Sequence, residues 1–89
     1  MFGLSAALYG QIDIENGVPV QGNFDSYQLI RMNEAPPVDV AILESGAPLT
    51  GMGEPGVPPI APAICNAIFT LTGLRIRQLP IADQLADLG

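Results

Sequence analysis

The stretch of this sequence best suited to chemistry is GMGEPGVPP, residues 51–59, in which Glu54 is the only charged residue among three glycines and three prolines. Proline disfavours the helical region for the residue before it, so Pro55 holds Glu54 in an extended conformation. The flanking glycines allow positive φ angles or a close approach of the backbone to a ligand. The pattern therefore predicts a carboxylate that the loop presents rather than leaves free to move.

A loop with a solvated glutamate is the alternative, because a short Gly-and-Glu pattern is a weak motif. The chain has no histidine and a single cysteine, Cys65, so neither a zinc site of the usual ligand types nor an internal disulfide is expected. No second acid can be assigned a position beside Glu54, which argues against a self-contained hydrolase. Any catalytic role of Glu54 requires a cofactor or a partner.

The composition indicates a chain that buries apolar surface against other protein. Its 89 residues suffice for one domain at most, yet 48% are hydrophobic and 13% are charged. The charged share is about half that of a typical soluble domain. Nine acidic residues against three arginines give a net charge of −6, which argues against nucleic acid or an anionic membrane surface as partner.

Neither a membrane span nor an export signal is expected. The uncharged residues 55–74 contain four prolines and leave only about a dozen residues for an uninterrupted helix, whereas a span needs roughly 20. Residues 1–8 are apolar but lack the basic leader and cleavage site of a secretory signal.

The elements around Glu54 are expected to form a single α+β unit over residues 1–89. Residues 2–9 predict a short helix that ends at Gly10. The alternation at 12–15, the Asn16-Gly17 turn and the apolar residues at 18–20 predict a β-hairpin, with Pro19 on an edge strand.

Two further elements flank the glycine-rich loop. Alternation over Val38–Glu44 predicts another strand. The run from Pro58 to the stop at Gly73 predicts a C-terminal helix that is apolar nearly all round and therefore buried. Cys65 on this helix is expected to be a small buried group rather than a reactive thiol. Residues 74–79 predict a short strand or extended segment, and residues 82–89 a tail that is either a frayed helical turn or disordered.

The run GMGEPGVPPIAPAICNAIFTLTGLRIRQLPI, residues 51–81, resembles the C-terminal segment of a known family of large subunits. These are the molybdenum-cofactor-binding subunits of the xanthine dehydrogenase and aldehyde oxidase family, in the branch of isoquinoline oxidoreductase and related aldehyde dehydrogenases. The upstream stretches FGLSAALYGQIDIENG and NFDSYQLIRMNEAPPVDV, residues 2–17 and 23–40, resemble the same branch. The resemblance covers about residues 2–81 and is more specific than the Gly-Glu pattern alone.

The resemblance implies that Glu54 is the general base beside the molybdenum, where it would remove a proton from a metal-bound hydroxyl during oxidation of an aldehyde or N-heterocycle. Gly53 would contact the molybdopterin-type cofactor, and no protein ligand to the metal is implied. Most pterin-binding segments of the family lie outside these residues. The chain is therefore expected to be part of a larger domain: a C-terminal fragment, a truncated reading frame or one piece of a split subunit.

Two functions follow as expectations. In the first, the chain completes a molybdenum hydroxylase with the remainder of the large subunit and an iron–sulfur subunit, and is inactive and free of cofactor on its own. In the second, it is a non-catalytic structural module derived from that family, whose apolar helix is covered by self-association.

Overall fold

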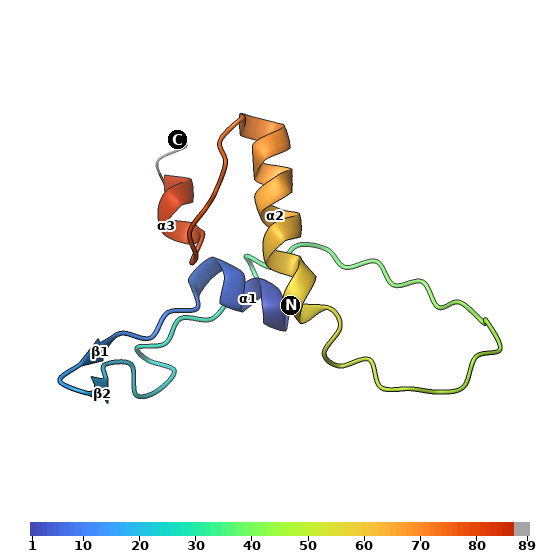
Figure 1. Cartoon of the computed structure of the whole chain (residues 1–89), viewed down its shortest axis with the longest axis horizontal. Coiled ribbons are helices and arrows are strands. Elements are labelled where there is room, and N and C mark those ends of the chain that lie inside the picture. The colour runs from blue at the N-terminus through green and yellow to red at the C-terminus, as the bar shows by residue number, and fades with distance from the viewer. Residues whose placement is uncertain (87–89) are drawn as a thin grey trace.

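A computed structural model describes residues 1–86, which form a small mixed α+β arrangement (Figure 1). The expected class is confirmed, and the last three residues of the expected tail lie outside the described part. The elements in chain order are α1 (Phe2–Tyr9), β1 (Ile14–Glu15), β2 (Val18–Pro19), α2 (Val57–Thr72) and α3 (Ala82–Leu85). Helix α3 is a single turn, as one of the two expectations for this region had it.

Helix α1 forms where the sequence predicts it and supplies part of the core. The Gly10 N–H donates to the carbonyl of Ala6 at 2.9 Å and ends the helix. Leu4, Ser5 and Ala7 are buried. The Ser5 hydroxyl accepts a hydrogen bond from the Ile30 N–H at 2.9 Å, so the polar group is satisfied and the segment around residue 30 is tied to α1.

Strands β1 and β2 form the expected antiparallel hairpin, with Ile14 opposite Pro19. Asn16 and Gly17 have φ values of 53° and 78°, the positive pair that a two-residue type I′ turn requires. The hairpin is short, and its apolar side chains are exposed rather than half-buried. They stay exposed because no helix of the described residues packs extensively against the hairpin (Figure 1).

The expected strand over Val38–Glu44 is also wrong. Residues 35–52 form neither helix nor strand, and the chain here runs as a long loop that projects away from the helices (Figure 1). A strand requires a hydrogen-bonded neighbour. Within residues 1–86, no neighbour pairs with this segment.

Helix α2 begins and ends where expected, with Pro58 in its first turn and Gly73 after its last residue. Gly73 adopts a φ of 77°, and its N–H caps the helix on the Phe69 carbonyl at 2.8 Å. The expected burial is wrong, since no residue of α2 is buried. One side is covered by α1 and the segment before α3, and the described residues supply nothing for the other side.

A small core lies where α1, α2 and residues 76–81 meet. Its buried members are Ala7, Ile76 and Ile81, and Ile64 and Ile68 of α2 pack against them half-exposed. The N–H of Ile81, which is completely buried, donates to the Ala7 carbonyl at 3.0 Å. No helix within residues 1–86 has both the length and the apolar character to cross a bilayer.

Candidate functional site

Glu54 lies in a turn that leads directly into α2. Its carbonyl accepts a hydrogen bond from the Val57 N–H at 2.9 Å, so the backbone of the glutamate is fixed relative to the first residue of the helix. The side chain is exposed. It borders an open cavity of about 400 Å³, which is also lined by Gly51, Gly53, Pro55 and Pro58. The Glu54 side chain thus borders the cavity from a turn whose backbone is bonded to α2, an exposed position that a presented base and a solvated loop glutamate would both have.

The carboxylate of Glu54 has no competing partner nearby. No hydrogen bond or ion pair from residues 1–86 engages its oxygens. The nearest arginine along the chain, Arg75, follows the far end of α2, which has 16 residues and is therefore about 24 Å long. Arg75 is instead held by Asn66, whose Oδ1 accepts from its Nη1 at 2.8 Å, and lies 3.8 Å from the centre of the Phe69 ring.

The described residues do not fit a cofactor site that this chain alone could complete. A Cβ atom built on Gly51, Gly53 or Gly56 would meet no atom within 4 Å, so the glycines do not form a closed cradle. No cluster of three or more potential metal ligands occurs in the part of the chain that the structure describes. Residues from outside this chain would have to enclose any cofactor that lies beside Glu54.

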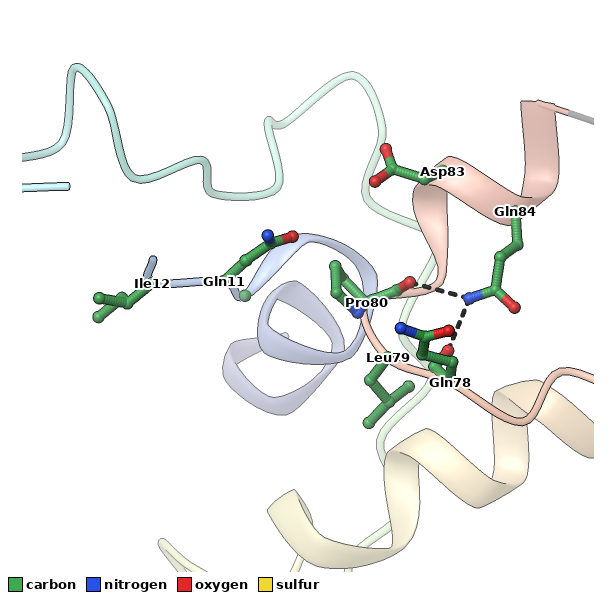
Figure 2. Close-up of a pocket in the computed structure, with 8 residues that line it drawn as sticks. Gln11, Ile12, Gln78, Leu79, Pro80, Asp83 and Gln84 are labelled. Atoms are coloured by element: carbon green, nitrogen blue, oxygen red, sulfur yellow. Dashed lines mark hydrogen bonds between the residues drawn. The ribbon is translucent and has the colours of Figure 1, made fainter. Parts of the chain in front are cut away.

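A second cavity, of about 560 Å³, lies away from Glu54 where α3 approaches the end of α1 (Figure 2). Figure 2 shows Gln84 turned toward the chain before α3, where its Nε2 donates to the carbonyls of Gln78 at 2.6 Å and Pro80 at 3.0 Å. Asp83 is the only acid in its lining, which contains no nucleophile. The bonded glutamine braces the chain, and the cavity offers no arrangement for catalysis.

Two polar contacts were not predicted from the sequence. The Tyr9 hydroxyl donates to Glu34, and the Arg31 N–H donates to the other carboxylate oxygen at 2.8 Å. These bonds lower the pKa of Glu34, with the Tyr9 bond as the main cause. The same bond is the main cause that raises the pKa of Tyr9. The partners are 25 residues apart, so no local pattern in the sequence reveals the pair.

The second contact braces the hairpin. Gln11 and Gln21 donate to Asp13 at 2.9 and 3.0 Å and lower its pKa. The hairpin register places residues 13 and 21 near each other, so the turn at Asn16-Gly17 was the signal that could have suggested this contact. Both contacts stabilise exposed loops and lie outside the cavity beside Glu54.

Sequence comparison finds relatives of this chain that are named as dehydrogenases or oxidoreductases. It is 40% identical over 90 residues to a membrane-bound aldehyde dehydrogenase of Gluconacetobacter polyoxogenes, named for pyrroloquinoline quinone, with 99% of this chain and 12% of that protein covered. It is 36% identical over 86 residues to isoquinoline 1-oxidoreductase subunit beta of Brevundimonas diminuta, with 97% and 11% covered. It is 33% identical over 89 residues to a xanthine dehydrogenase molybdenum-binding subunit of Escherichia coli O157:H7, with 92% and 12% covered.

The chain is homologous to subunits of the xanthine dehydrogenase and aldehyde oxidase family. The resemblance noted in the sequence is thereby confirmed. No family model matches the chain, and no solved structure matches it.

The chain spans 11–12% of the length of these relatives. Three surfaces lack cover within the described residues of this short span. They are the exposed side of α2, the unpaired residues 38–44 and the open cavity beside Glu54. In the aldehyde dehydrogenase, the polypeptide outside the aligned span is about seven times as long as the span itself, which is ample to cover these surfaces.

Proposed function

We propose that this chain is a segment of the large subunit of a molybdenum hydroxylase that oxidises an aldehyde or an N-heterocycle. One observation carries this proposal: nearly the whole chain aligns with relatives named as an aldehyde dehydrogenase, an isoquinoline oxidoreductase and a molybdenum-binding subunit. Residues 1–89 would act as a single unit in which the family match covers about residues 2–81 and residues 82–89 form a tail. The partners would be the remainder of the large subunit and an iron–sulfur subunit.

In this proposal Glu54 is the general base. The turn before α2 fixes the backbone of Glu54, and no hydrogen bond from residues 1–86 occupies its carboxylate oxygens, so both remain available to accept a proton. Gly53 would let the backbone lie close to a molybdopterin-type cofactor, since a Cβ there would occupy open space. Because the described residues do not enclose such a group, the cofactor would be bound mainly by polypeptide outside this chain.

A chimera tests the role of Glu54. The chain would replace the aligned segment of the Brevundimonas diminuta subunit beta, and the enzyme would be assayed for isoquinoline oxidation. Glu54→Gln should lower turnover by about 10²- to 10⁴-fold, the usual contribution of a positioned base, while molybdenum content stays unchanged. Glu15→Gln, which changes an exposed acid of the β-hairpin outside the cavity, is the matched control and should leave turnover as it was. Equal turnover of the Glu54→Gln variant and its parent would refute the assignment.

The isolated chain should carry no molybdenum and oxidise no aldehyde, because its described residues do not enclose a cofactor beside Glu54. Elemental analysis of the purified chain checks this expectation, and stoichiometric metal would contradict it.

A second candidate function is a non-catalytic module that covers its apolar surface by self-association. The observation that favours it is the number of large apolar side chains that the described chain leaves at least four-fifths exposed, among them Phe2, Met32 and Leu71. Light scattering on the isolated chain separates the candidates. A stable oligomer supports the module, whereas a monomer with a cooperative melt removes the need for self-association.

A further inference from the structure

Residues 38–44, with the sequence VDVAILE, have the composition of a strand but no strand neighbour. They lie in a stretch of 37 residues, 20–56, without helix or strand. Structureless loops of this length are uncommon inside compact domains and are usually flexible linkers or functional segments. Linkers are rich in glycine, serine or charge, whereas this segment is rich in valine, isoleucine and leucine. Its composition therefore does not fit a linker.

The exposure of the segment is unusual for its side chains. Val38 is 64% exposed, Val40 78%, and Ile42 and Leu43 87% each. No backbone hydrogen bond within residues 1–86 involves positions 38–44, so the N–H and C=O groups all face solvent. An exposed run of apolar side chains and unpaired backbone groups is the surface that pairs with another strand.

We propose that residues 38–44 form a strand by pairing with the edge of a β-sheet in the remainder of the large subunit. This inference rests on the proposed function, because it takes the partner to be the rest of that subunit. Seven residues extend over about 23 Å, the length of an ordinary strand. Pro37 ends the strand on one side, since it has no N–H to donate, and Gly46 with its φ of 76° turns the chain on the other side.

The sequence of the strand indicates what kind of sheet receives it. Val38, Val40 and Ile42 share one face, with Glu44 at its end. Ala41 and Leu43 lie on the other face, with Asp39 near the opposite end. Both faces are thus largely apolar, as in strands that are covered on both sides. The receiving sheet should carry protein layers on both faces rather than one face open to water.

The remainder of the subunit is a better partner than a second copy of this chain. In the relatives, about 88% of the polypeptide lies outside the aligned span, which supplies ample material for a sheet. Each copy of the chain carries a net charge of −6, so association of two copies brings like charges together. The segment itself contributes Asp39 and Glu44 to that repulsion.

Hydrogen exchange tests the inference in the same chimeric subunit beta. The amides of residues 38–44 should exchange on the order of 100-fold more slowly in the chimera than in the isolated chain, because pairing makes them depend on local unfolding. Equally fast exchange of residues 38–44 in a soluble chimera would overturn the proposal. Protection of these amides in the isolated chain that grows with the concentration of the chain would also overturn it, because it would identify a second copy as the partner.

Side-chain substitutions provide a second measurement. Ile42→Asp should prevent a tagged copy of this chain from copurifying with a subunit beta that lacks its aligned segment, because it places a charge on a covered face. Leu49→Asp, at a fully exposed position outside the strand, should not. If the unmodified chain fails to copurify, the proposal is wrong even where the chimera is insoluble. If residues 38–44 are protected but Glu54→Gln leaves turnover unchanged, only the catalytic role of Glu54 is refuted. If Glu54→Gln lowers turnover but residues 38–44 exchange as fast as in the isolated chain, only the strand is refuted.

Discussion

Replacing Gly3 with alanine measures the contact between α1 and α2. A Cβ atom on Gly3 would lie 2.8 Å from Ile60 Cγ2, 3.1 Å from Val57 Cα and 3.3 Å from the Val57 carbonyl oxygen. The Ile60 side chain can rotate away from the new methyl group. The backbone of Val57 cannot, because its N–H is bonded to Glu54 and the residue begins α2. The two helices would therefore have to separate.

Two opposing effects set the magnitude. Overpacking a close contact costs about 1–3 kcal/mol. Alanine favours a helix interior over glycine by up to about 1 kcal/mol, and the gain is smaller here because Gly3 lies in the first turn. The steric cost exceeds the gain, so Gly3→Ala should reduce the stability of the α1–α2 contact by about 1–2 kcal/mol.

Amide exchange of the isolated chain followed by NMR provides the assay. The amides of α1 and of the first half of α2 should lose protection by about 5- to 30-fold, which corresponds to that free energy. Gly22→Ala is the matched control, because a Cβ there meets nothing within 4 Å and its φ is not positive. Unchanged or increased protection in Gly3→Ala would refute the close approach of the two helices.

Two other predictions concern the core and the loop contacts. Ile81→Ala empties a completely buried position and should cost about 2–5 kcal/mol, seen as loss of amide protection at Ala7 and Ile64, whereas Leu85→Ala at the exposed end of α3 should cost far less. The pKa of Glu34 is lower in the folded chain than in the unfolded chain. The ionised Glu34 carboxylate therefore stabilises the fold above the pKa that Glu34 has in the unfolded chain, and this stabilisation is lost as the pH falls through its pKa in the folded chain. Tyr9→Phe should return the pKa of Glu34 toward its ordinary value in an NMR titration, Tyr27→Phe should not, and equal titration of both variants would contradict the bond to Tyr9.

Elements encoded by neighbouring residues were predictable from the sequence. The stop of α1 at Gly10, the Asn16-Gly17 turn and the start and end of α2 were all predicted and are confirmed. Each depends on the φ and ψ preferences of one or two residues and on hydrogen bonds within a few positions. The exposed, fixed placement of Glu54 is of the same kind, since Pro55 and the start of α2 lie within three residues of it.

Burial and pairing were not predictable, because they depend on what else is present. The apolar pattern of α2 predicted a buried helix and the alternation of residues 38–44 predicted a strand, yet α2 is half-covered and the segment is unpaired. Likewise, the Tyr9–Glu34 bond and the crossing at Gly3 join residues far apart in the chain. The sequence by itself determined where the chain turns, where its helices begin and end and which surfaces must be covered, because these properties are local. Only the tertiary structure decided which of those surfaces this chain covers, because burial requires a second surface and a strand requires a hydrogen-bonding neighbour.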